Sequence, residues 1–299
     1  MQEEKSIGFK FIILVLSVVA GALLGNGIML LALQLSGSAS LSENTLSELL
    51  SDSSNSILIV SLVGLSHALL FIGGATCYWW FTRRSSYATD FSIKRKIDWS
   101  LLGILLLLLV ASYPLVGASG LVAEYLPLPE WMRSLDTEYA ETMNSMFGGE
   151  GLARLALNIV VIALLPAIGE ELIFRGVVQK ELHKAISNPH LVIFITSVIF
   201  SAIHLQAEGF LPKLCISYVL CYAYYWTRNL LYPMILHFVN NASMTVALYA
   251  SAGLPMEEVE TSALDFPWLV VGFSLFLCGM IVVSITSRPN LPSKSAPNL

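Results

Sequence analysis

Long apolar runs separated by short polar stretches dominate this chain of 299 residues. A helix that crosses the hydrocarbon core of a bilayer, ~30 Å thick, needs about 20 mostly apolar residues. The apolar runs are Phe11–Leu35, Ile57–Phe81, Trp99–Ala118, Leu152–Phe174, Leu191–Leu205, Leu211–Trp226, Leu231–Ala252 and Pro267–Ile285. They predict an all-α fold, a polytopic membrane helix bundle of about eight transmembrane helices. The first run is longer than the ~7–15-residue apolar core of a cleaved signal peptide, so we expect it to be retained.

Basic residues indicate on which side of the membrane each loop lies. Between the second and third runs the loop contains Arg83, Arg84, Lys94, Arg95 and Lys96. By contrast, residues 36–56, after the first run, contain no Lys or Arg. Short cytoplasmic loops are enriched in these residues. The pattern therefore predicts that both termini are cytoplasmic and that the acidic loops before the fourth and eighth runs lie outside.

The chain has no linker, internal repeat or low-complexity tract, so we expect one membrane domain with four consecutive parts. Residues 1–118 would form N-terminal transmembrane helices without motifs. Residues 119–150 would form an extracytoplasmic loop, in which Pro129-Glu130-Trp131 favours the start of a short helix. Residues 151–252 would form a catalytic helical core, and residues 253–299 the last transmembrane helix and a cytoplasmic tail.

Composition agrees with lipid as the surroundings of this chain. Hydrophobic residues make up 56% and charged residues only 12%, whereas soluble domains are about 25% charged. This excludes a soluble globular enzyme. The net charge is −5, and no long basic run is present. Because binding to phosphate groups needs concentrated Lys and Arg, this argues against a nucleic-acid partner.

Ionisable and amide side chains within apolar runs are costly in lipid, so they are the candidates for function. Three short motifs in the fourth, fifth and seventh runs carry them. The candidate residues are Glu170, Glu171, Arg175, His204, His237 and Asn241. Residues four apart on a helix share a face, so Glu171 can pair with Arg175. Glu170 is rotated by about 100° from Glu171 and is left to act as a base.

The other two motifs supply groups that could act with Glu170. His237 and Asn241 share a helical face, and both can donate hydrogen bonds to a developing oxyanion. His204 could complete a water-activating pair with Glu170. Each motif alone also has a structural interpretation, as a snorkelling ion pair or as histidines held in packing. His67, in the second run, has no acidic or amide partner at helical spacing, and we interpret it as a packing residue.

Depth in the membrane sets a condition on a site shared by Glu170 and His204. The two residues can meet if the fifth helix begins in the cytosol, and Ser187-Asn188-Pro189 is suited to such a start. They can also meet if the fourth helix continues well past Arg175. We expect both, with Pro166 kinking the fourth helix.

The three motifs together resemble a known family. In this order and on separate membrane helices, E-E-x-x-x-R, F-x-x-x-H and H-x-x-x-N resemble the motifs of the CPBP family (CAAX protease and bacteriocin-processing, also called Abi) of intramembrane proteases. Type II CAAX prenyl endopeptidases are among its members. The resemblance covers roughly Gly151 to Ala252 and fills every motif position, including Phe200.

The resemblance implies hydrolysis of a peptide bond within the membrane. Glu170 and His204 would activate a water, His237 and Asn241 would stabilise the oxyanion, and the ion pair of the first motif would support them. The substrate would be a membrane-embedded or membrane-associated peptide, and the protein a multi-pass protein of a bacterial plasma (inner) membrane. An alternative function is a non-catalytic bacteriocin-immunity protein or peptide-binding scaffold that uses the same cavity.

Metal dependence stays open at this point, and no cofactor is certain. Glu170, His204 and His237 would make a zinc-binding set similar to the His₂Glu sites of catalytic zinc enzymes. Against this, the sequence has no H-E-x-x-H, the helical zinc-protease signature. We favour water activation without a metal and keep zinc as the alternative.

Overall fold

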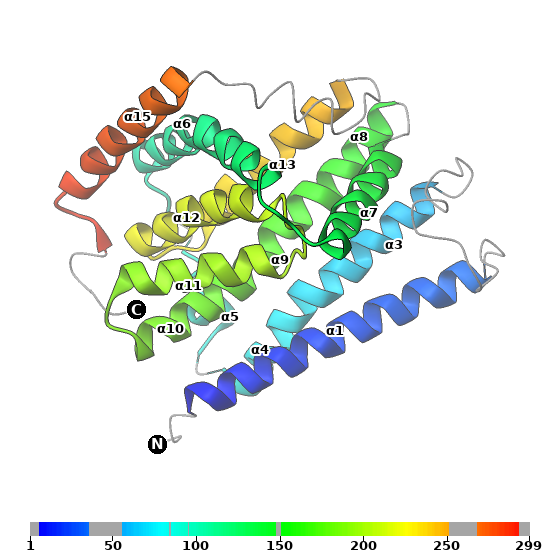
Figure 1. The fold of residues 1–299 in the computed structure, drawn as a ribbon. Helices are drawn as coiled ribbons and strands as arrows, with labels where there is room; N and C mark the ends of the chain where they lie inside the picture. The colour runs from blue at the N-terminus through cyan, green and yellow to red at the C-terminus, as the bar shows by residue number, and fades with distance from the viewer. Residues whose placement is uncertain are drawn as a thin grey trace. The chain divides into compact units, whose positions relative to one another are not determined.

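The computed structural model describes residues 6–35, 56–83, 85–94, 96–147, 151–250 and 268–292, and every regular element within those ranges is a helix (Figure 1). The α-helices are α1 (Ile7–Leu35), α3 (Ser56–Ala68), α4 (Gly74–Thr82), α5 (Tyr87–Asp90), α6 (Trp99–Glu124), α7 (Glu130–Phe147), α8 (Leu152–Asn158), α9 (Leu165–Ile173), α10 (Lys180–Ala185), α11 (Pro189–Ala202), α12 (Phe210–Thr227), α13 (Leu231–Ala250) and α15 (Trp268–Ser287). Three π-helical segments are η1 (Leu69–Gly73), η2 (Ile159–Leu164) and η3 (Phe174–Gln179). The predicted all-α class is confirmed.

Five helical stretches of the described residues are long and apolar enough to cross a membrane, and the chain is an integral membrane protein. They are Ile7–Leu35, Ile57–Thr82, Trp99–Ala123, Leu152–Ala185 and Trp268–Ser287. The other three predicted runs form α11, α12 and α13, of 14, 18 and 20 residues. The count of eight spans and the cytoplasmic termini remain predictions. The predicted acidic loop before the last helix lies outside the described residues.

The chain forms two compact units that alternate along the sequence. The first comprises Met1–Ile93, Thr142–Glu181 and His237–Gly253, and the second Lys94–Glu141, Leu182–Leu236 and Leu254–Leu299. The first unit therefore contains α1, α3, α4, α8, α9 and the later part of α13. The second contains α6, α11, α12 and α15. The division into four consecutive parts remains a prediction.

In the first unit, α1 packs along α3, η1 and α4 (Figure 1). Glycines on α1 allow this approach. A Cβ atom on Gly25 would lie 2.8 Å from Ser66 Cα, and one on Gly21 would collide with the carbonyl oxygen of Leu69. Small residues let helix backbones come close together in lipid, where packing drives helix association. These contacts hold α3 and η1 in place beside the helix that carries the first motif.

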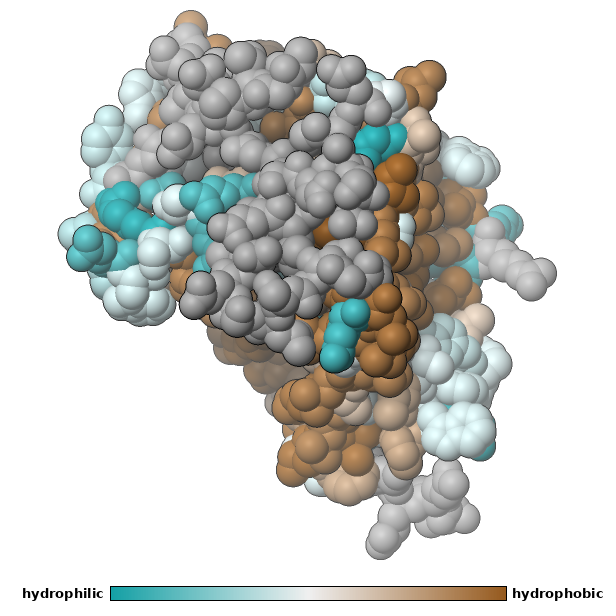
Figure 2. Space-filling model, turned by 90° about the vertical axis from the view of Figure 1, so that its right-hand side faces the viewer, coloured by the Kyte–Doolittle hydropathy of each residue, from teal (hydrophilic) through white to brown (hydrophobic). Residues whose placement is uncertain are grey.

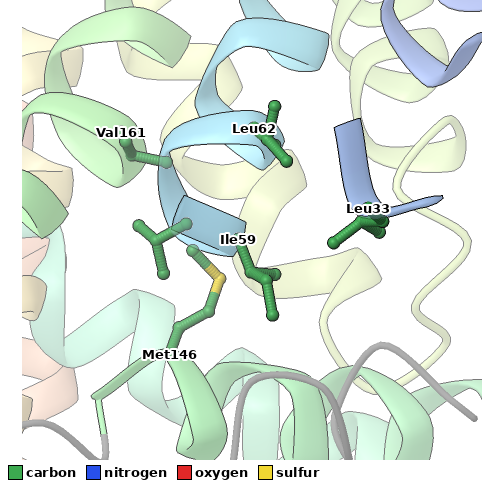
Figure 3. Close-up of a cluster of buried hydrophobic side chains, with 6 residues drawn as sticks. Leu33, Ile59, Leu62, Met146 and Val161 are labelled. Carbon is green, nitrogen blue, oxygen red and sulfur yellow. The ribbon is translucent and has the colours of Figure 1, made fainter. Parts of the chain in front are cut away.

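An apolar cluster lies within the first unit (Figure 3). Its buried members are Leu33, Ile59, Val60, Leu62, Met146 and Val161. Beside it, the carbonyl oxygen of Met146 accepts hydrogen bonds from Arg154 Nε and Nη2, at 3.1 and 2.9 Å, and from Asn158 Nδ2 at 3.0 Å. The last carbonyls of a helix need such partners when they are buried. The end of α7 is thereby fixed to α8.

The helix that carries the first motif continues without a break through α8, η2, α9, η3 and α10, from Leu152 to Ala185. It therefore extends past Arg175, as predicted. In the second unit, α11 begins at Pro189, and Asn188 Oδ1 caps it by accepting from His190 N at 3.0 Å and Leu191 N at 3.4 Å. The predicted start of the fifth helix is confirmed.

Many of the exposed side chains are apolar. On α1 the exposed residues include Ile12, Leu16, Leu23 and Leu31. Figure 2 shows apolar side chains over much of one face of the molecule. An exposed apolar area of this kind marks an interaction surface rather than a water-facing one. Since these helices are long enough to span a bilayer, lipid tails are the partner of that surface.

Candidate active site

A buried ion pair forms the base of the candidate site. Glu171 lies near the end of α9 and Arg175 in η3, four residues later. Arg175 Nη1 donates to Glu171 Oε1 at 2.7 Å, and both side chains are 0% exposed. Moving a charged side chain out of water costs roughly several kcal/mol, unless good pairing geometry and further hydrogen bonds compensate. The predicted pairing is present, but complete burial makes it more than a snorkelling pair.

His237 on α13 joins this pair from a distant part of the sequence. Its Nδ1 lies 2.8 Å from Glu171 Oε1, and its side chain is 5% exposed. A carboxylate paired with a guanidinium is ionised and only accepts, so His237 Nδ1 donates. One oxygen of Glu171 thus holds both Arg175 and His237. The ring of His237 is fixed, and its Nε2 points to the neighbouring carboxyl group.

That neighbouring group is Glu170, which lies between two imidazoles. His237 Nε2 is 4.0 Å from Glu170 Oε2, and His67 Nε2, on α3, is 3.7 Å from Glu170 Oε1. The Glu170 side chain is 8% exposed. Glu170 therefore lies close to two groups that can exchange protons, whereas the Glu171 carboxylate is engaged by Arg175 and His237.

A glycine next to Glu170 allows α9 to approach η1 at this point. A Cβ atom on Gly169 would lie 2.6 Å from Phe71 Cβ and 3.2 Å from Ile72 Cγ1. Real Cβ atoms do not approach this closely, so only glycine fits here. The N-terminal helices, in which no motif was found, form the wall of the candidate site in the first unit.

Asn241, one turn after His237, bonds to the helix of the first motif. Its Nδ2 donates to the carbonyl oxygen of Ile162 at 3.2 Å. Pro166 has no N–H group, so the carbonyl four residues earlier, that of Ile162, loses its usual α-helical donor. The side chain of Asn241 supplies the missing donor, and an amide NH₂ has a second N–H for another acceptor. The π-helical segment η2 lies directly before this point, where a kink was predicted.

His204 belongs to the second unit and lies just after the end of α11. Its Nδ1 is 2.7 Å from the carbonyl oxygen of Phe200, and the two rings are 5.0 Å apart. A carbonyl oxygen only accepts, so Nδ1 carries the hydrogen and Nε2 keeps a lone pair. The spacing F-x-x-x-H thereby fixes the tautomer that can take a proton. A site shared by His204 and Glu170 remains a prediction.

The zinc alternative requires a group of side chains that could bind the metal together. Over the part of the chain that the structure describes, no three His, Cys, Asp or Glu side chains gather into a group that could hold a metal ion. The predicted set of Glu170, His204 and His237 draws on both units and remains a prediction.

The structure brings together four of the predicted residues and adds one. Glu170, Glu171, Arg175 and His237 lie in one cluster of the first unit. The addition is His67, which was interpreted as a packing residue because its own helix offers no polar partner. Its partner comes from α9. The available signal was the cost of placing an ionisable side chain in an apolar run, which applies to His67 as to the other histidines.

Comparison with known proteins agrees with the motifs. Residues 152–243 match the family model described as Type II CAAX prenyl endopeptidase Rce1-like. The chain is 35% identical over 89 residues to "Uncharacterized protein YpbD" of Bacillus subtilis (strain 168), which covers 28% of this chain and 42% of that protein. It is 26% identical over 98 residues to "Membrane-embedded CAAX protease MroQ" of Staphylococcus aureus (strain USA300), which covers 31% of this chain and 40% of that protein.

These matches span less than half the length of each relative. No solved structure gives a significant match to the chain. All three motifs lie inside the segment that the family model covers. The resemblance to the type II CAAX prenyl endopeptidases is thereby confirmed over residues 152–243.

Proposed function

We propose that this protein is an intramembrane endopeptidase that hydrolyses a peptide bond of a membrane-associated polypeptide. The position of the Glu170 carboxylate carries the proposal, because it is buried beside two imidazoles and next to a separately neutralised Glu171. A carboxyl group with a second, fixed carboxylate next to it is suited to exchange protons during hydrolysis. The match to a peptidase family over the same segment supports this reading.

In the proposed reaction, Glu170 accepts a proton from a water molecule. The water oxygen then bonds to the carbonyl carbon of the peptide, and the carbonyl oxygen becomes an oxyanion. When the C–N bond breaks, the proton passes from Glu170 to the leaving amine. His204 acts with Glu170 on the water, and its Nε2 lone pair, left by the bond from Nδ1 to Phe200, is suited to this.

His237 and Asn241 stabilise the oxyanion in this proposal. Since His237 Nδ1 already donates to Glu171, the ring can donate to an oxyanion only from a protonated Nε2. As Glu170 is protonated, negative charge moves to the oxyanion, so the charge around His237 is conserved. The side-chain amide of Asn241 has two N–H groups, and the one that does not bond to the Ile162 carbonyl donates to the oxyanion.

The substrate is proposed to be a polypeptide that reaches the site from the lipid bilayer. The site lies on helices long enough to span a membrane. Both relatives come from bacteria, which supports a bacterial plasma membrane as the location. The name of one relative specifies a CAAX protease.

The test is a cleavage assay with the full chain in liposomes. The probes are a quenched fluorescent CAAX peptide in farnesylated and unprenylated forms, together with membrane peptides extracted from cells that carry the chain, followed by mass spectrometry. Glu170→Gln and His204→Ala should each lower turnover by roughly 10²–10⁴-fold, the range for acid and base groups. Glu208→Gln, an exposed glutamate of the second unit, is the matched control and should leave turnover unchanged.

Cleavage by folded Glu170→Gln at the wild-type rate would overturn the proposed mechanism. A protein that binds membrane peptides equally well with and without Glu170→Gln, and cleaves none of them, would support the non-catalytic scaffold instead.

A further inference from the structure

His67 is a polar side chain in an otherwise apolar stretch of α3. The stretch Ile57–Thr82 is apolar enough to span a membrane. The His67 side chain is 22% exposed, and its Nε2 has no hydrogen-bond partner among the described residues. A buried nitrogen without a hydrogen bond costs free energy, so a partner is expected during function.

The nearest carboxylate to that nitrogen is Glu170. His67 Nε2 lies 3.7 Å from Glu170 Oε1, slightly beyond hydrogen-bond length. Catalytic hydrogen bonds are often long in ligand-free enzymes and shorten when substrate binds. A small rotation of either side chain would close this distance. His67 is thus a polar side chain of α3 that lies close to Glu170.

The surrounding backbone holds His67 at this place. Its ring packs against Phe71 with centroids 4.6 Å apart, and Phe71 lies in the π-helical segment η1. The same segment contacts Gly169, the residue before Glu170. π-Helical turns within α-helices occur frequently at functional sites. The contact of Gly169 with η1 therefore sets the distance between His67 and Glu170 through the backbone.

Each oxygen of Glu170 lies near a different imidazole. His237 faces Oε2 and is itself fixed by Glu171. His67 faces Oε1 and is fixed by Phe71. Resting on the proposed function, we propose that His67 is a positioning residue, whose Nε2–H holds Glu170 Oε1 so that Oε2 is presented to the attacking water.

The activity test uses His67→Leu and His67→Gln in liposomes, with the farnesylated CAAX peptide as probe. His67→Leu removes the donor, whereas the amide of His67→Gln can donate from a similar position. We expect His67→Leu to lower kcat by about 10–100-fold, since misplacing a reacting group by about 1 Å can cost that much, with KM within about twofold. His67→Gln should restore most of the rate.

The control is Ser61→Ala on the same helix, because the Ser61 hydroxyl donates back to the Ile57 carbonyl of its own helix. It should leave kcat unchanged. If His67→Leu retains the wild-type kcat, or if His67→Gln is no better than His67→Leu, the positioning role is overturned. If His67 had a packing role alone, kcat would follow the size of the side chain and the melting temperature rather than the presence of a hydrogen-bond donor.

A second measurement does not depend on cleavage. In the ¹⁵N-histidine NMR spectrum of the full chain in detergent, the His67 Nε2 signal, assigned by its loss in His67→Gln, should shift in Glu170→Gln and stay unchanged in Glu208→Gln. A His67 Nε2 signal that is unchanged in Glu170→Gln overturns the positioning role even if the protein cleaves peptides. A signal that shifts in a protein that cleaves none of the probes supports the contact and overturns the proposed peptidase function.

Discussion

The first and third motifs are held in place differently from the second. Glu171, Arg175 and His237 form a fully or nearly fully buried cluster from elements 66 residues apart in sequence. His204 is half-buried and is oriented by Phe200, four residues earlier, at the end of a single helix. The first arrangement ties the chemistry to the stability of the fold, whereas the bond from His204 to Phe200 is local to the end of α11. Substitutions in the two regions should therefore separate stability from activity.

The largest loss of stability is expected from Arg175→Met. It leaves the Glu171 carboxylate buried without its guanidinium, and breaking a buried pair costs about 3–5 kcal/mol. The free energy of unfolding in mixed detergent micelles measures the effect. Adding Glu171→Gln to Arg175→Met removes the uncompensated charge and should recover part of the loss. A double variant no more stable than Arg175→Met would contradict the charge argument.

His204→Ala should show the opposite behaviour. We expect turnover to fall by roughly 10²–10⁴-fold while the free energy of unfolding changes by no more than about 0.5 kcal/mol. Parallel cleavage and unfolding measurements give both values. His190→Ala, an exposed histidine at the start of the same helix that contacts Tyr222, is the control and should keep full turnover. A large loss of stability in His204→Ala would erase the contrast between the two regions.

Gly169→Ala tests how tightly the first region is packed. The new methyl group would meet Phe71 Cβ at 2.6 Å, so we expect a cost of about 1–3 kcal/mol, typical of overpacking. Gly103→Ala, where nothing lies within 4 Å, is the matched control. It should stabilise α6 slightly, since alanine favours helix by up to about 1 kcal/mol over glycine. Equal effects at both positions would argue against a close approach at Gly169.

Asn241→Ala separates a structural role from a catalytic one. It removes the donor to the Ile162 carbonyl and should cost about 1–2 kcal/mol. In a Pro166→Ala background the backbone N–H returns, so the stability cost of Asn241→Ala should shrink. Turnover, in contrast, should stay low if Asn241 also serves the oxyanion. Unfolding and cleavage measured across this double-mutant cycle distinguish the two roles, and full recovery of turnover would leave only the structural one.

The smallest effect is expected at the surface of the second unit. Arg133 Nη1 and Glu208 Oε1 form an ion pair at 3.1 Å, with side chains 46% and 41% exposed. Exposed pairs contribute about 0–1 kcal/mol and weaken with salt. Arg133→Gln should therefore change the free energy of unfolding by less than about 0.5 kcal/mol at 0.15 M salt. A larger, salt-insensitive loss would show that this pair is not the simple surface contact described.

The sequence alone determined the membrane character, the all-helical class and the pairing of Glu171 with Arg175 along one helix. Helical spacing is sufficient to predict that Glu171 faces Arg175. The cap at Asn188 and the first-turn proline at Pro189 are likewise local features. Such predictions succeed because a helix repeats every 3.6 residues, so the spacing of residues in the sequence shows which side chains share a face.

Only the tertiary structure decided which faces meet. His67 beside Glu170, His237 on Glu171, and Asn241 on the carbonyl that Pro166 leaves without its donor all join different helices. Helical periodicity contains no information about the partner of a face. That choice depends on where glycines permit close approach and on which buried polar groups must find hydrogen bonds once water is absent.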